Sequence, residues 1–137
     1  MKVLVATDGS EYAMKAVRRA LEIAEHEGAE VTVISVAFYS REDLKDMPPG
    51  VREKLEALAV EALASAKALF DAKGIPVKTI LEAGLVPANI IIRTAEEGGF
   101  DRILLGSMGF GGLKRIFLGS TAAKVVANAP CSVTVIR

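Results

Sequence analysis

The sequence lacks tryptophan, and only 5% of its 137 residues are aromatic. It also has a single cysteine, Cys131, which excludes an intramolecular disulfide and a cysteine-based zinc cluster. Cys131 follows a proline at the start of an expected strand, so we expect a packing role rather than a reactive thiol. The only histidine, His26, lies between Glu25 and Glu27, a setting that favours a solvated surface position.

A charge excess and a long apolar run are absent too. The chain has 17 Lys plus Arg and 17 Asp plus Glu, so it lacks the basic footprint of extended nucleic-acid binding. No apolar run approaches the ~20 residues that a membrane span needs. The opening apolar run, residues 3–6, is shorter than a signal-peptide core and ends before Asp8. We therefore expect a soluble, cytoplasmic protein with no nucleic-acid or membrane partner.

Hydrophobic residues are abundant (51%) and are mainly Val, Ile, Leu and Ala, as in buried parallel strands flanked by helices. The length fits one domain, residues 1–137. Apolar runs alternate with segments of helical periodicity, which predicts an α/β fold with a parallel sheet and helices on both faces. The expected strands are residues 3–6, 31–38, 77–81, 102–105 and 132–136, and the expected helices are about 11–27, 51–73, 87–98 and 120–128.

Three local patterns refine this prediction. Asp8 or Ser10 is suited to cap the first helix, and Gly28 to end it. Residues 39–50, with their charges and prolines, are interpreted as an exposed loop. The long helix carries an apolar stripe that predicts its buried face: Leu55, Leu58, Ala59, Ala62, Ala66, Leu69 and Phe70.

Two loops follow expected strands at positions where a doubly wound sheet binds its ligand. In such sheets ligands bind at the carboxyl ends of the strands, where the strand order reverses. The first loop is residues 6–10, Ala-Thr-Asp-Gly-Ser. The second is the glycine-rich segment 106–112, which continues to Gly119, Ser120 and Thr121.

The second loop has the chemistry of a phosphate site. Glycines let backbone N–H groups approach an anion, and the helix that opens at residue 120 attracts phosphate with its free N–H groups. Lys114 and Arg115 could add charge. The alternative is a surface turn followed by an ordinary serine cap.

The two best-known phosphate fingerprints are not met. No G-x-G-x-x-G follows the first strand, and the Walker spacing that starts at Gly106 and Gly111 continues with Gly112 and Leu113 instead of Lys-Ser/Thr. A P-loop NTPase is therefore disfavoured.

The glycine spacing matches a different pattern. Gly106-x2-Gly109, nine residues and then Gly119-Ser120 resembles the G-x2-G-x9-G-S/T signature of the universal stress protein family. The opening segment 3–10 and the closing segment 126–135 also resemble that family, so the resemblance covers the whole chain. It implies a three-layer α/β/α sandwich, like that of the adenine nucleotide alpha hydrolases, with a five-stranded parallel sheet of order 3-2-1-4-5.

The resemblance also implies a site for ATP, as in the nucleotide-binding branch of the family. Asp8 would lie near the ribose and could reach a metal, although it could also serve as a helix cap. Val36 would touch the adenine or be simply core, and Met108 would be a lid or a plain loop residue. The cofactor-binding residues implied are Ala6, Thr7, Asp8, Val36, Gly106, Met108, Gly109, Gly119, Ser120 and Thr121.

A triphosphate usually travels with Mg²⁺ or Mn²⁺, but the sequence has no dedicated carboxylate cluster for such an ion. We identify neither a metal ligand nor a catalytic residue. The expected function is therefore an ATP-binding protein with a regulatory or protective role in stress response. The alternatives are a slow ATPase in which Asp8 orients water, and a receiver-like or flavodoxin-like signalling domain.

The last expected strand bears on assembly. It carries Val133, Val135 and Ile136, an edge too apolar to be left open. In the family the last strands pair across a two-fold axis, so the resemblance implies a homodimer through residues 132–136.

Overall fold

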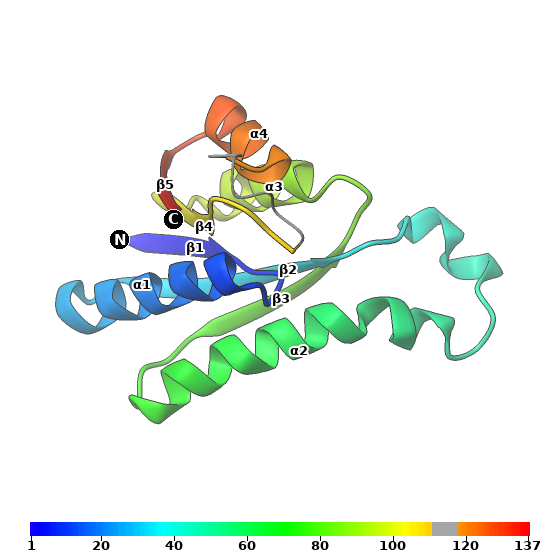
Figure 1. The fold of residues 1–137 in the computed structure, drawn as a ribbon, viewed down its shortest axis with the longest axis horizontal. Coiled ribbons are helices and arrows are strands. Elements are labelled where there is room, and N and C mark those ends of the chain that lie inside the picture. The colour runs from blue at the N-terminus through cyan, green and yellow to red at the C-terminus, as the bar shows by residue number, and fades with distance from the viewer. Residues whose placement is uncertain (111–117) are drawn as a thin grey trace.

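The computed structural model describes residues 1–110 and 118–137. Its centre is a parallel sheet of order β3-β2-β1-β4-β5, which confirms the expected fold class and strand order (Figure 1). The strands are β1 (Lys2–Ala6), β2 (Glu30–Ala37), β3 (Lys78–Ala83), β4 (Arg102–Gly106) and β5 (Ser132–Ile136).

Helices cover both faces of this sheet, as Figure 1 shows. They are α1 (Glu11–Glu27), α2 (Val51–Ala72), α3 (Pro87–Gly98) and α4 (Ser120–Asn128). Successive side chains of a strand point to opposite faces of the sheet, so a strand contributes residues to the hydrophobic core on each face. Val3 and Val5 pack with α1 and α2, whereas Leu4 packs with α3 and α4.

The ends of the elements follow from local chemistry. Gly28 and Gly99 adopt the left-handed conformation (φ 69° and 64°) that ends α1 and α3. Pro87 occupies the first turn of α3, where its missing N–H costs nothing. Ser10 is the N-cap residue of α1, but its side chain makes no capping hydrogen bond.

The expected buried face of α2 is partly wrong. Ala59, Ala62, Ala66 and Phe70 are buried, but Leu58 remains 68% exposed. Leu55 is exposed as well. Ala59, the neighbour of Leu58, is buried in a cluster with Ala37 of β2 and Ala83 of β3, so the buried face of α2 is narrower than the expected stripe and leaves Leu55 and Leu58 outside it.

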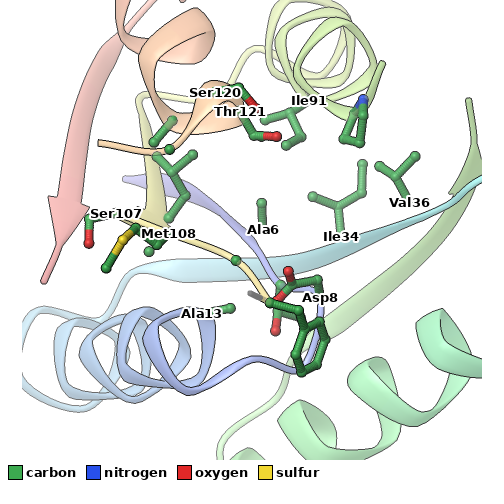
Figure 2. A pocket seen from close by; sticks show the side chains of 18 residues that line it. Ala6, Asp8, Ala13, Ile34, Val36, Ile91, Ser107, Met108, Ser120 and Thr121 are labelled. Carbon is green, nitrogen blue, oxygen red and sulfur yellow. The ribbon is translucent and has the colours of Figure 1, made fainter. Parts of the chain in front are cut away.

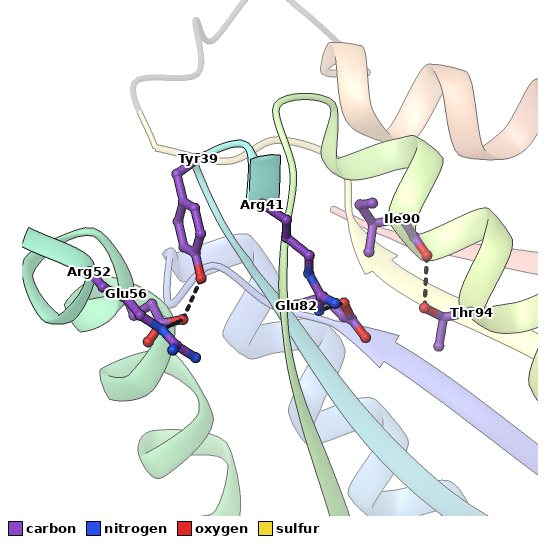
Figure 3. A network of polar contacts seen from close by, with 7 residues as sticks. All are labelled: Tyr39, Arg41, Arg52, Glu56, Glu82, Ile90 and Thr94. Carbon is purple, nitrogen blue, oxygen red and sulfur yellow. Dashed lines mark hydrogen bonds and ion pairs between the residues drawn. The ribbon is translucent and has the colours of Figure 1, made fainter. Parts of the chain in front are cut away.

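Residues 39–50 are not simply an exposed loop. They contain a 3-10 helix, η1 (Arg41–Asp46), which has no buried residue of its own. Tyr39 before it is buried and donates its hydroxyl to Glu56 Oε2 of α2 at 2.7 Å. Arg41 forms an ion pair with Glu82 of β3, so two polar contacts fasten this segment to the domain (Figure 3).

The remaining expectations concern the surface. His26 is exposed, as expected. Cys131 is partly buried against the α3–α4 core, and burial together with the charge of Asp101 raises the pKa of its thiol. A raised pKa keeps the thiol protonated, which agrees with a packing role. In the described ranges, no helix combines the length and apolar character needed to cross a membrane.

Candidate functional site

A cavity of about 600 Å³ opens at the carboxyl ends of β1, β2 and β4 (Figure 2). β1 lies between β2 and β4. The chain leaves β1 toward α1 on one face of the sheet and leaves β4 toward α4 on the other, so the carboxyl ends of β1 and β4 form the topological switch point of the sheet. All ten site residues expected from the sequence line the cavity: Ala6, Thr7, Asp8, Val36, Gly106, Met108, Gly109, Gly119, Ser120 and Thr121.

The loop after β1 is held by its own side chains. The backbone N–H of Ser10 donates to Asp8 Oδ1 at 2.8 Å, and that of Gly9 donates to Thr7 Oγ1 at 3.0 Å. The Asp8 side chain therefore stabilises the turn that leads into α1, while Ser10 is the N-cap residue. One carboxylate oxygen, Asp8 Oδ2, is left to face the loop after β4.

Gly109 leaves room for Asp8 Oδ2 because it has no side chain. A Cβ atom on Gly109 would lie 2.6 Å from Asp8 Oδ2, much closer than any real contact. The absent side chain thus lets the loops after β1 and β4 meet through a carboxylate.

The other two signature glycines also have neighbours in the protein. A Cβ on Gly106 would lie 2.6 Å from the carbonyl carbon of Tyr12 and 2.8 Å from the Ala13 nitrogen, so Gly106 allows β4 to end against the first turn of α1. Gly119 donates its N–H to the Ser107 carbonyl at 2.6 Å, and a Cβ there would lie 3.2 Å from the same oxygen. The glycine spacing therefore reflects chain packing around the cavity, in addition to any approach of an anion.

One end of the cavity offers hydrogen-bond donors. α4 begins at Ser120 after the N-cap residue Gly119, which provides no side-chain cap. The first N–H groups of this nine-residue helix have no partner within the helix, and its dipole favours negative charge. Ser120 and Thr121 add hydroxyl groups on the side of the cavity opposite Asp8 (Figure 2).

The other end is apolar and includes residues that the sequence analysis missed. Ile34 and Val36 alternate on β2 and so share one face of the sheet, while Pro87 and Ile91 face them from α3. The strand alternation at Ile34 and the proline at the start of α3 were available signals. The other missed lining residues are Ala13, Leu105, Ser107, Phe110 and Ala122.

The electrostatics of the cavity are simple where the structure describes it. Among the described lining residues, Asp8 is the only one with a formal charge. No group of three or more His, Cys, Asp or Glu side chains gathers to hold a metal within residues 1–110 and 118–137. The suggested contributors Lys114 and Arg115, and the glycines at 111 and 112, lie outside the described residues.

The arrangement defines a class of protein: a doubly wound parallel α/β domain whose cavity has an apolar end and a donor-rich end with a helix N-terminus. A family model described as the universal stress protein family matches residues 1–137. Universal stress protein MJ0531 of Methanocaldococcus jannaschii is 36% identical over 141 residues, spanning 99% of this chain and 81% of that protein.

Solved structures agree with this match. That of the hypothetical protein MJ0577 superposes with a TM-score of 0.83 at 29% identity, covering 98% of this chain and 94% of the other. The universal stress protein from Archaeoglobus fulgidus in complex with dAMP superposes with a TM-score of 0.74 at 26% identity, covering 100% and 98%. The chain belongs to the universal stress protein family.

Proposed function

We propose that this chain is an ATP-binding universal stress protein with a regulatory or protective role, and that the nucleotide lies in the cavity between the loops after β1 and β4. The observation that carries the proposal is the convergence of all ten expected residues, from four separate segments, on one cavity. A relative of the same fold in complex with dAMP supports an adenine nucleotide as the ligand class.

The cavity is polarised as such a ligand requires. A purine needs apolar walls, which Val36, Ile34 and Pro87 provide. Phosphates need donors, which the start of α4 provides through backbone N–H groups and the hydroxyls of Ser120 and Thr121. The ribose would then lie between these ends, beside Asp8.

The residues present fit a metal only as a companion of the nucleotide. In the described lining, Asp8 is the only carboxylate, and one of its oxygens is bound by the Ser10 N–H. Mg²⁺ or Mn²⁺ would therefore be held mostly by phosphate oxygens, and Asp8 Oδ2 is the carboxylate oxygen in the described lining that could serve as a further ligand.

Identification of the nucleotide that copurifies with the protein, after denaturation, is the most direct test. Titration calorimetry with ATP, ADP and AMP, with and without Mg²⁺, then ranks the ligands. Thr121→Ala should weaken ATP binding, whereas Thr79→Ala, an exposed threonine of β3, should leave it unchanged. Failure to copurify a nucleotide or to bind added ATP would contradict the proposal.

Slow hydrolysis is the second candidate function. It would require Asp8 to orient a water molecule, because the described lining holds no other ionisable side chain. The Ser10 N–H contact and the close fit against Gly109 favour a structural and binding role for this carboxylate instead. Turnover of labelled ATP that Asp8→Ala abolishes would establish the ATPase and displace the purely regulatory role.

We further propose a homodimer through β5, with the cytoplasm as its compartment. β5 is an edge strand whose Val133, Val135 and Ile136 side chains remain half-buried, which leaves backbone and apolar surface available for a second copy. Sedimentation at micromolar concentration tests the dimer, and Val135→Lys should shift the protein toward monomer. Cell fractionation tests the compartment.

A further inference from the structure

Glu82 of β3 does not line the cavity itself but lines a separate, smaller hollow together with Arg41, beside the apolar end of the cavity. It is in register with Val36 of β2, which lines that end. Register partners on neighbouring strands lie about 4.8 Å apart and project from the same face of the sheet. Glu82 is therefore the next side chain after Val36 in the direction away from β1.

The strand order fixes the direction in which a bound base would point. Under the proposed function, on which this inference rests, the ribose lies beside Asp8 at the end of β1 and the base lies over Val36 of β2. β3 follows β2 in the sheet. A nucleoside that runs from the end of β1 across β2 directs the far edge of its base toward β3, where Glu82 lies one strand spacing (about 4.8 Å) beyond Val36.

The carboxylate of Glu82 is held in place but is not saturated. Its side chain is 24% exposed, and it pairs with Arg41 of η1, which is 60% exposed. Figure 3 shows this pair on the side of β3 that faces Ile90 of α3, whereas Tyr39 and Glu56 lie on the α2 side. A carboxylate has about four acceptor positions, so the pairing with Arg41 leaves acceptors for a ligand.

Glu82 and Arg41 differ in how firmly they are placed. Glu82 is on a strand of the central sheet, paired along its length with β2. Arg41 belongs to η1, where no residue is buried. The carboxylate of Glu82 is therefore the firmly placed group at the edge of the base, and Arg41 positions that carboxylate.

We propose that Glu82 determines base specificity by accepting a hydrogen bond from an exocyclic amino group on the far edge of the base. The ligand class is then a 6-aminopurine nucleotide. A 6-oxopurine presents a carbonyl oxygen at the same place, which a carboxylate repels.

Calorimetric titration with AMP and with IMP tests this directly, because IMP carries the carbonyl oxygen in place of the amino group. The wild-type protein should bind AMP about ten- to a hundredfold more tightly, the range expected for a hydrogen bond to a charged group. Glu82→Gln should reduce the preference to a few-fold, since a side-chain amide can donate to the carbonyl as well as accept.

Two variants separate recognition from folding and from loss of the ion pair. Glu42→Gln removes the same charge from an exposed position of η1 and should keep the full preference. Arg41→Gln breaks the pair with Glu82 but leaves the acceptor, so it should keep most of the preference for AMP.

Equal binding of AMP and IMP by the wild type, or an unchanged preference in a folded Glu82→Gln protein, would overturn this inference alone. Loss of the preference in Arg41→Gln, with retention in Glu82→Gln, would overturn it by assigning recognition to the guanidinium. If neither AMP nor IMP binds, the same comparison is made with ATP and ITP, and binding of none of the four would contradict the proposed function, and this inference with it.

Discussion

Asp8 Oδ2 occupies the position next to Gly109 that a side chain would otherwise fill, at 2.6 Å from the ideal Cβ. This relationship joins two loops about one hundred residues apart in sequence. An alanine in place of Gly109 would therefore displace the Asp8 side chain in the cavity and would leave the packing of the fold largely unchanged.

We predict that Gly109→Ala lowers nucleotide affinity about tenfold while changing stability by no more than about 1 kcal/mol, because a carboxylate can move at the cost of one hydrogen bond. Calorimetric titration with ATP and urea unfolding measure the two effects. In an Asp8→Ala background the same substitution should cost much less affinity, since the clash is gone. Additive losses in the double variant would show that Asp8 is not the cause.

Gly106→Ala should act on the fold instead. Its Cβ would meet backbone atoms of Tyr12 and Ala13 at 2.6–2.8 Å, and a helix backbone cannot rotate away. We expect a loss of about 1–3 kcal/mol in the free energy of unfolding, measured in urea. Gly119→Ala meets its nearest atoms at 3.2 and 3.4 Å and should cost clearly less; an equal loss in the two variants would contradict this explanation.

Ser120→Asp should separate stability from binding. A negative charge in the first turn of α4 favours the helix by about 0.3–1 kcal/mol, but it also occupies and repels the expected phosphate position. We therefore expect a higher melting temperature together with weaker ATP binding. Ser120→Asn, which has nearly the same shape without charge, should bind ATP more tightly than Ser120→Asp. Stronger binding by the aspartate variant would exclude phosphate at this helix end.

Tyr39 predicts a pH dependence of stability. Burial first, and then the hydrogen bond and negative charge of Glu56, raise the pKa of the Tyr39 hydroxyl, while Arg52 opposes the shift. The folded state therefore keeps this proton above the ordinary pKa of about 10. The associated stability is complete below that pH and is lost as the pH rises through the folded-state pKa.

The matching variant is Tyr39→Phe. It should lower the free energy of unfolding at pH 8 by about 0.5–1.5 kcal/mol, the usual worth of one hydrogen bond. Urea unfolding from pH 8 to 11 should then show a steeper decline for the wild type than for the variant. Parallel declines would mean that another group governs the alkaline limb.

The sequence by itself determined the element order, because apolar runs of strand length alternate with segments of helical period. It also determined most boundaries, for instance the residues Ser120–Asn128 of α4 and Ser132–Ile136 of β5. The glycine spacing and the segment at Asp8 carry the resemblance to the universal stress protein family, and that resemblance implied the ten residues that line the cavity.

Only the tertiary structure decided which apolar residues have a partner. Periodicity assigned Leu58 to the apolar stripe of α2, yet it stays exposed, whereas its neighbour Ala59 is buried with Ala37 and Ala83. Conversely, Tyr39 lies in a segment of loop-like composition but is buried against α2. The same holds for Asp8 with Gly109 and for Val36 with Glu82, because contacts between distant segments depend on strand register and helix packing, which local patterns do not encode.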